Sequence, residues 1–394
     1  MQSLHSQAIA HLEALKKDSN LRTLIPQKHH NLMLTTQGST LLNLASNDYL
    51  GLSSNTNFNA RFLDSNLFKE HCYFSASSSR LLSGNFEVCN LLETHLKMLF
   101  NKEVLLFNSG YHANVGILNA LSALNVLFIA DKSIHASHID GLKGFKKPRL
   151  KRFAHNDMNS LESLLAKNSE NYDAVLILSE GLFSMEGDFA PLQQLIALKK
   201  KFNNVYLYLD EAHSIGSFGD GGLGLCKHLN LLEEIDFLIL TFGKALSSMG
   251  ACVLCNAIFK DYFINTARSL IYSTALPPIN IARTLFTLLE LPKLDKQRAH
   301  LTNLSIHLKT LLQKTLDHEI LGDYNIISLV LGENTKALHF SKMLRKKGYF
   351  APAIKTPSVP KNRALLRFSL TANMDFKLLD NLVKSLSEIA NATL

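Results

Sequence analysis

The stretch LILTFGKALSSMGA, from Leu238 to Ala251, sets a lysine directly behind a run of apolar residues. The run as far as Thr241 reads as a buried strand, and Lys244 then stands between Gly243 and a series of small residues. Lysine is almost never fully buried without a partner, because removing an ammonium from water is costly. Lys244 therefore either reaches solvent from a turn or has a chemical role that explains its position.

Short apolar runs of the same kind recur between longer helical patterns. They cover Val104–Phe107, Leu127–Ala130, Ala174–Ser179, Val205–Asp210 and Phe237–Thr241. Strands that are apolar on both faces and alternate with helices are typical of a parallel sheet covered on both sides. The pattern predicts one large α/β domain over residues 46–285, built on a mostly parallel sheet.

Residues 286–394 show a different pattern. Two helical stretches are followed by the strand-like runs IISLVL and LLRFSL and by a C-terminal amphipathic helix, which together predict a smaller α+β domain. In residues 1–45, Leu4, Leu12 and Leu15 lie near helical spacing and predict an N-terminal amphipathic helix. We expect this N-terminal segment to pack with the small domain.

The bulk composition excludes several classes of protein. The 394 residues are 46% hydrophobic and carry a formal net charge of +8, so phosphate-bearing or acidic small molecules are favoured as partners. The basic residues are scattered, which argues against nucleic-acid binding. The N-terminus lacks a signal-peptide pattern and no apolar run reaches membrane-spanning length. We expect a soluble cytoplasmic protein.

The cysteines and paired histidines do not suggest a metal site. The five cysteines are an odd number at irregular spacing, as expected for reduced thiols in the cytoplasm. Cys252 and Cys255 form a CxxC, but they lie in a strand pattern that turns them to opposite faces. His135 and His138 lack a third ligand at suitable spacing. We therefore predict no metal.

Polar residues stand where predicted strands end, which is where open parallel sheets bind ligands. Asp210 ends one strand in DEAHSIG, and its carboxylate could pair with a protonated heteroaromatic nitrogen, cap a helix or ligate a metal. In FNSGYHANVGILNAL the chain passes through Ser109–Gly110 into a helix, whose first N–H groups suit a phosphate. A glycine at such a turn is also common for steric reasons alone.

Together these features suggest a cofactor. Pyridoxal 5′-phosphate requires a lysine for a Schiff base, an acid for its ring nitrogen and a phosphate cradle. A desolvated lysine has a depressed pKa and can act as a nucleophile, which explains Lys244. Of His135 and His213, one could stack on the pyridine ring and the other could bind its phenolic oxygen.

The chain resembles the α-oxoamine synthases, which are fold-type I pyridoxal-phosphate enzymes of the aspartate aminotransferase superfamily. The motifs that carry the resemblance are SNDYLGLS, LLFNSGYHAN, ADKSIHAS, RFAHND, SEGLFSMEGDFAPL, DEAHSIGSFGDGGLG, TFGKALSSMGA and IYSTALPP. They span most of the chain in order. The resemblance implies an α/β large domain with a mostly parallel seven-stranded sheet, a smaller α+β domain and a homodimer with active sites at its interface.

The resemblance also implies roles for individual residues. Lys244 is similar to the Schiff-base lysine, Asp210 to the partner of the ring nitrogen, His213 to the residue at the phenolic oxygen and His135 to the residue stacked on the ring. Further cofactor contacts are expected from Ser109, Gly110, Tyr111, Ser184 and Thr241, and from Ser273 and Thr274 toward the neighbouring subunit's phosphate. Substrate contacts are expected from Arg22, Asn47, His135, Lys355, Ser358 and Arg367.

RFAHND and SMEGDFAPL are most similar to one branch of the family. That branch condenses L-alanine with a pimeloyl thioester, on coenzyme A or acyl carrier protein, to give 8-amino-7-oxononanoate, CO2 and free thiol in biotin biosynthesis. The alternative is glycine C-acetyltransferase or another α-oxoamine synthase that uses glycine or a different acyl-CoA. The chain departs from the family pattern at Ser77 and Ser78, usually glycines, at Cys89, usually histidine, and at Lys355–Thr356 and Ser358.

Overall fold

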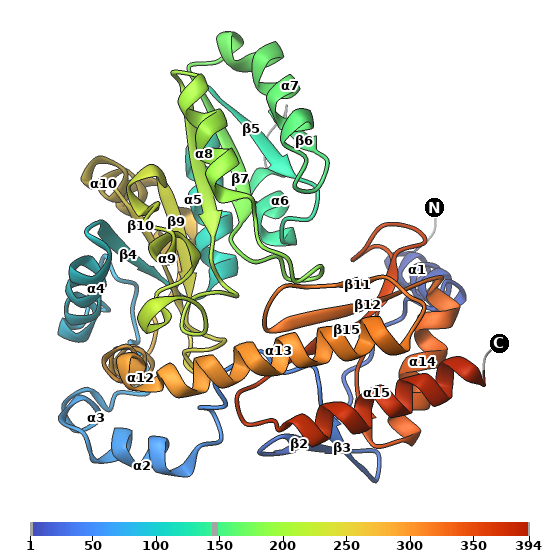
Figure 1. Ribbon diagram of the computed structural model, residues 1–394. Coiled ribbons are helices and arrows are strands. Elements are labelled where there is room, and N and C mark those ends of the chain that lie inside the picture. Colours follow the sequence, from blue (N-terminus) through green and yellow to red (C-terminus); the bar gives the residue numbers. More distant parts are fainter. Residues whose placement is uncertain (1–2, 144–148, 393–394) are drawn as a thin grey trace.

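The computed structural model describes residues 3–143 and 149–392. A large sheet with helices around it forms one part of the molecule, and two smaller sheets with long helices form the other (Figure 1). No helix in these ranges is both long and apolar enough to cross a bilayer.

The large sheet has seven strands, as the family resemblance predicted, and their order is β4-β10-β9-β8-β7-β5-β6. β10 runs antiparallel to its neighbours β4 and β9, and the remaining pairs are parallel. The bounds are β4 Glu103–Phe107, β10 Ala251–Cys255, β9 Phe237–Thr241, β8 Val205–Asp210, β7 Ala174–Glu180, β5 Val126–Asp131 and β6 Leu150–Phe153. The five apolar runs of the sequence are therefore confirmed as strands.

Helices cover this sheet because its central strands are apolar on both faces. α5 packs on α6 and contacts β9 and β10, while α8 packs on β8 and contacts α7. The bounds are α4 Glu87–Phe100, α5 Gly110–Ser122, α6 Ala136–Leu142, α7 Met158–Asn168, α8 Leu192–Lys201, α9 Leu225–His228, α10 Ala257–Thr266 and α11 Arg268–Ile271. Cys252 and Cys255 are fully buried in β10, so they contribute to the core as expected.

The C-terminal part is built on an antiparallel sheet in the order β11-β12-β15-β14. The strands are β11 Ile320–Leu321, β12 Ile326–Gly332, β15 Ala364–Ser369 and β14 Ala353–Ile354. The helices are α13 Asp295–Thr315, α14 Asn334–Lys346 and α15 Phe376–Asn391. α14 packs on this sheet and α15 packs on both other helices.

The predicted boundary between the two domains falls inside a helix. α12 (Pro278–Glu290) runs through residue 285, where we expected a boundary, because its apolar face continues through Leu285 and Leu288. It packs on α4 and α3 (Asn66–His71), next to α2 (Thr56–Asp64), and so belongs to the large part throughout. The last helical turn of the large part thus lies beyond the predicted boundary.

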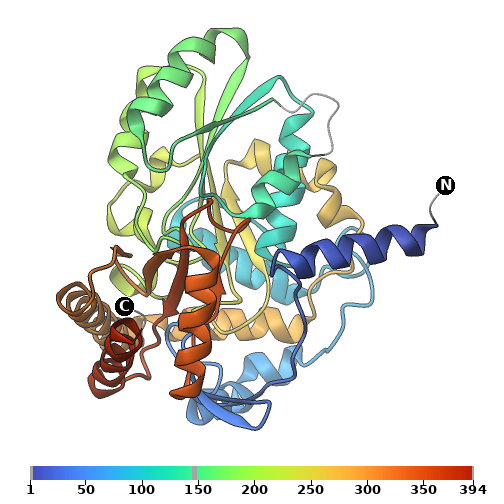
Figure 2. The ribbon, with the colours of Figure 1, turned by 90° about the vertical axis from the view of Figure 1, so that its right-hand side faces the viewer.

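The N-terminal segment differs from the expectation in its helix. β1 (Lys28–His30), β2 (Met33–Thr36) and β3 (Ser39–Asn43) form a third sheet with β13 (Tyr349–Phe350), which joins this segment to the C-terminal part. α1 (Leu4–Lys17), however, buries none of its residues and extends away from the body of the chain (Figure 2). Its Leu4 and Leu12 stay exposed because nothing in the described chain covers that face.

Candidate active site

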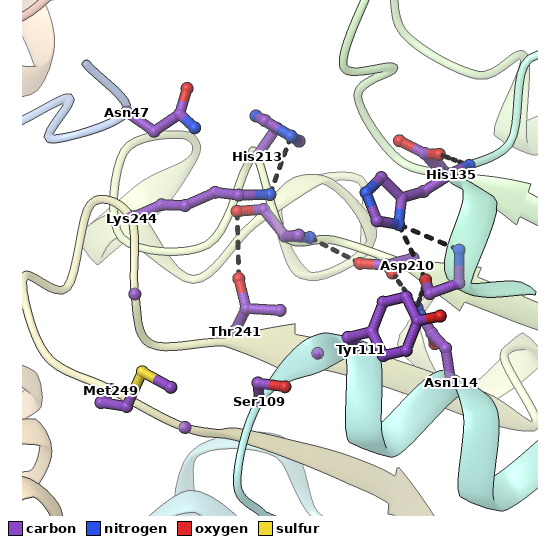
Figure 3. A pocket seen from close by; sticks show the side chains of 16 residues that line it. Asn47, Ser109, Tyr111, Asn114, His135, Asp210, His213, Thr241, Lys244 and Met249 are labelled. Carbon is purple, nitrogen blue, oxygen red and sulfur yellow. Dashed lines mark hydrogen bonds between the residues drawn. The ribbon is translucent and has the colours of Figure 1, made fainter. Parts of the chain in front are cut away.

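A pocket of about 280 Å³ opens where several strands of the large sheet end (Figure 3). It brings together nine residues that the sequence analysis selected, and they come from distant parts of the chain. These residues are Asn47, Ser109, Gly110, Tyr111, His135, Asp210, His213, Thr241 and Lys244. The carboxyl-end rule for parallel sheets explains why these residues meet in one pocket, and their roles stay predictions.

Lys244 lies in the loop between β9 and β10 and extends into this pocket (Figure 3). Its side chain is half-buried rather than buried, because the pocket leaves part of it open. The surrounding protein nevertheless lowers its pKa to about 8, chiefly through desolvation, aided by Arg367 and opposed by Asp210 and Glu180. A substantial fraction of the amine is therefore neutral near physiological pH.

Asp210, at the end of β8, is buried and held by two donors. The Asn114 side-chain amide donates to Oδ2 at 2.9 Å, and the Ala212 N–H donates to Oδ1 at 2.9 Å. Tyr208 in turn donates to the Asn114 oxygen at 2.6 Å. The sequence analysis missed Asn114, although its place one turn into the helix after Ser109–Gly110 could have indicated it.

The turn before α5 has the geometry of an anion site. Ser109 caps α5 by accepting the N–H of His112, so the helix begins at Gly110, and Ser109, Gly110 and Tyr111 line the pocket at this helix N-terminus. A Cβ on Gly110 would lie 2.6 Å from Thr241 Cγ2, so only glycine fits there. The steric explanation of this glycine therefore applies, and its role in phosphate binding stays a prediction.

His135 faces the pocket from the N-terminus of α6. Its backbone N–H donates to Glu180 Oε1 at 2.6 Å, and its Nδ1 lies 2.8 Å from Ser137 Oγ. Desolvation lowers its pKa, with a smaller opposing effect of Asp210, so the ring is neutral. Glu180, which the sequence analysis missed, is buried beside Asp210, and both burial and that neighbour raise its pKa well above the usual range.

His213 joins Lys244 to a residue outside the pocket lining. Its Nε2 lies 2.8 Å from Lys244 Nζ, and its Nδ1 lies 2.5 Å from the hydroxyl of Tyr49. Burial, Lys244 and Arg367 hold the pKa of His213 well below its ordinary value. The imidazole is therefore neutral and carries a single N–H.

Arg367, on β15, is a buried guanidinium at the edge of this site. It donates to the Ser184 carbonyl at 2.6 Å, to Ser369 Oγ at 2.6 Å and to Asn47 Oδ1 at 3.2 Å. Within the described residues no carboxylate lies within ion-pair distance of it. A buried cation without an anion is costly, so the arrangement favours an anionic ligand.

The remaining predicted residues lie outside the pocket lining. Ser184 contributes its carbonyl to Arg367, and the Thr274 carbonyl accepts the Asn108 amide at 2.7 Å, close to the Ser109 turn. Ser273 makes no contact with the pocket, Arg22 and Ser358 are exposed, and Lys355 donates to the carbonyl of Ser19. The single chain thus leaves the predicted roles of Ser273, Thr274, Arg22, Lys355 and Ser358 untested.

The residues present fit pyridoxal 5′-phosphate. A lysine with a lowered pKa, a buried carboxylate and a helix N-terminus that begins at a glycine face one pocket. Fold and site together define a pyridoxal-phosphate enzyme of the aspartate aminotransferase type.

Comparison with known proteins agrees with this class. The family model for aminotransferase class I and II matches residues 39–386. The 8-amino-7-oxononanoate synthase of Haemophilus ducreyi is 44% identical over 93% of this chain and 96% of its own length. The chain therefore belongs to the aminotransferase class I and II family and, within it, to the α-oxoamine synthases, which are pyridoxal-phosphate enzymes.

Solved structures show the same fold. A structure of SPT (serine palmitoyltransferase) with a PLP (pyridoxal 5′-phosphate) internal aldimine is 25% identical to this chain. Its TM-score is 0.88, and the match covers 99% of both chains. The 8-amino-7-oxononanoate synthase of Francisella tularensis is 27% identical, with a TM-score of 0.74 over 90% of this chain and 98% of that one. The fold-type I architecture expected from the motifs is thus confirmed, as is the cofactor.

Proposed function

We propose that the protein condenses L-alanine with a pimeloyl thioester to give 8-amino-7-oxononanoate, CO2 and free thiol in biotin biosynthesis. The observation that carries the amino-acid half of this proposal is Arg367, a buried guanidinium without a carboxylate partner in the described chain. The forked guanidinium suits the carboxylate of an amino acid. Support for the alanine and pimeloyl specificity comes from the 8-amino-7-oxononanoate synthases among the relatives.

The cofactor, when bound, supplies an electron sink that stabilises the carbanion formed at the amino acid Cα. Lys244 would hold it, and Asp210, itself held by Asn114 and Ala212, would keep the ring nitrogen protonated. The Ser109–Gly110 turn would receive the phosphate. Lys244 lines the same pocket and would accept and return the Cα proton of the amino acid, since its pKa of about 8 lies near physiological pH.

His135 and His213 would contact the cofactor ring from different elements. His135 faces the pocket from α6 as a neutral ring, and His213 reaches it from the loop after β8. Neutral imidazoles can pack on or donate to the ring without adding positive charge beside Lys244. Asn47, which lines the pocket and contacts Arg367, would lie beside the substrate carboxylate.

The active enzyme would be a homodimer with its sites at the interface. Large apolar side chains stay exposed on the single chain, among them Tyr73, Phe74, Leu82 and Tyr272, at 56–81%. Tyr111 and Met249 line the pocket and are also about half exposed, at 48% each. A second copy would cover these surfaces, and Ser273 and Thr274 would then face its phosphate. The five free cysteines suit a cytoplasmic location.

A direct test is to mix the purified, cofactor-loaded protein with L-alanine or glycine and a panel of acyl thioesters on coenzyme A and on acyl carrier protein. We expect 8-amino-7-oxononanoate, identified by mass, from alanine and the pimeloyl thioester, and none with Lys244→Ala. Efficient product formation from glycine and acetyl-CoA would instead establish the alternative, glycine C-acetyltransferase. The carrier that gives the higher kcat/KM identifies the natural thioester.

A further inference from the structure

Tyr49 is a fully buried residue that touches the site from behind the pocket lining. It lies in the turn after Asn47, 164 positions before His213, yet its hydroxyl is 2.5 Å from His213 Nδ1. The same hydroxyl is 3.1 Å from Asn47 Oδ1, and Arg367 Nη2 approaches it at 3.5 Å. A continuous chain of hydrogen bonds therefore runs from Tyr49 through both nitrogens of His213 to Lys244 Nζ.

The direction of these hydrogen bonds depends on which acceptor the Tyr49 hydroxyl donates its one hydrogen to. Burial raises the pKa of Tyr49 to about 12, so the hydroxyl keeps that proton and can donate it to either His213 or Asn47. The Asn47 oxygen already accepts a hydrogen bond from Arg367. The contact of the Tyr49 hydroxyl with His213 Nδ1 is much shorter than its contact with Asn47, and His213 Nδ1 has no other donor in the described chain. His213 Nδ1 is therefore the acceptor.

We propose that Tyr49 is a positioning residue that fixes the tautomer of His213 and so directs its single N–H, on Nε2, into the pocket. A neutral imidazole that accepts at Nδ1 must carry its hydrogen on Nε2. This hydrogen points at the Lys244 amine, where it opposes an ammonium and favours the neutral form. With the cofactor in place, the same N–H is a donor available to the phenolic oxygen.

Removing the Tyr49 hydroxyl releases this constraint. His213 is then able to carry its hydrogen on Nδ1 and to accept a hydrogen bond from the Lys244 ammonium at Nε2. The other charged groups around the amine stay in place, namely Asp210 and Glu180, which favour the ammonium, and Arg367, which disfavours it. The apparent pKa of Lys244 therefore rises in Tyr49→Phe, by about one unit, which is a tenfold loss of neutral amine below that pKa.

The test measures Lys244 directly in cofactor-free protein. Acetic anhydride labelling across a range of pH, read by mass spectrometry on the Lys244 peptide, gives its apparent pKa in wild type, Tyr49→Phe and the control Tyr262→Phe. Tyr262 donates to the Ala120 carbonyl at 2.9 Å and lies outside the pocket lining. We expect the rise in Tyr49→Phe only, and no further rise when Tyr49→Phe is added to His213→Gln, because the effect passes through His213.

An unchanged Lys244 pKa in a Tyr49→Phe protein that keeps the wild-type circular dichroism spectrum would overturn the proposal. So would an equal shift in the His213→Gln background, since Tyr49 would then act without the imidazole. The inference rests on the proposed roles of Lys244 and His213. A different thioester or amino-acid substrate would change the product assay but leave this labelling result unaffected, so the two failures are distinguishable.

Discussion

At the scale of single residues, the site depends on charges held in a partly dry pocket. Lys244 has a lowered pKa, and Arg367 has no carboxylate at ion-pair distance among the described residues, so both side chains suit an anionic or electrophilic ligand. Outside the pocket, one departure from the family pattern affects the backbone. Ser77, at a position where the family usually has glycine, adopts a left-handed backbone with φ of 54°, a conformation that glycine takes at lower cost.

Arg367 provides the residue-scale prediction. Arg367→Gln should raise KM for the amino acid by about 10- to 100-fold, because a charge-assisted hydrogen bond contributes about 1.5–3 kcal/mol. Steady-state kinetics with varied alanine would measure this. The cofactor absorbance should stay as in wild type, and Arg363→Gln, which removes a surface pair with Glu319, should leave KM within about twofold. A normal KM in Arg367→Gln would place the carboxylate elsewhere.

At the scale of elements, the segment after β7 links the two parts of the molecule. Leu182 bridges to Phe189, and the tip between them offers the Ser184 carbonyl to Arg367 and the Met185 carbonyl to Ser328. His155 holds the base of this segment. Its Nδ1 lies 2.9 Å from Asp131 Oδ1, and its Nε2 lies 3.0 Å from Asp188 Oδ2. The RFAHND and SMEGDFAPL motifs meet here, so their role includes positioning Arg367 through Ser184.

His155 gives the element-scale prediction. Despite the opposing effect of burial, the hydrogen bonds that the His155 ring donates to the Asp131 and Asp188 carboxylates raise its pKa to about 10. Because the folded pKa exceeds the unfolded value of about 6.5, this stabilisation is complete below pH 6.5 and is lost as the pH rises through 10. His155→Gln should lower the free energy of unfolding by on the order of 3 kcal/mol at pH 6 and by much less at pH 10.5.

Urea denaturation at the two pH values would measure this difference. The matched control is His307→Gln, which removes a partly exposed pair with Asp380 at 2.7 Å and should cost below about 1 kcal/mol. Equal losses for His155→Gln at pH 6 and pH 10.5 would mean that the ring contributes by packing on Phe183, at 4.5 Å between centroids, and not by charge.

At the scale of the whole molecule, the site needs both parts of the chain. Asn325, just before β12, donates to the His213 carbonyl at 3.1 Å, and Tyr324 donates to the Ser217 carbonyl at 2.5 Å. The C-terminal part therefore holds the loop that carries His213, and β15 contributes Arg367. We propose that a second copy covers the exposed apolar side chains, which include Tyr111 and Met249 of the pocket lining.

The oligomeric state is the prediction at this scale. Light scattering should give twice the chain mass of 43.9 kDa. Phe74→Glu combined with Leu82→Glu places two charges among exposed apolar side chains and should yield a monomer with at least tenfold lower activity. Ile258→Glu, an equally exposed change on α10, should remain dimeric and active. A fully active monomer would contradict the shared-site proposal.

The strands of the large sheet and the residues at their ends could be predicted from the amino-acid sequence. Short apolar runs predict strands directly. The rule that ligands bind at the carboxyl ends of parallel strands then predicts that Lys244, Asp210 and Ser109 lie at one site. The sequence also predicted α1 as a helix, since helical periodicity is a local property.

The contacts between side chains from distant parts of the chain could not be predicted in this way. Tyr49, Asn114 and Glu180 join the site through contacts with residues 45 to 164 positions away, and no local pattern encodes such contacts. The lowered pKa of Lys244 likewise arises from desolvation by surrounding walls that come from several elements. Whether the apolar face of α1 is covered also depends on what packs against it, which periodicity does not specify.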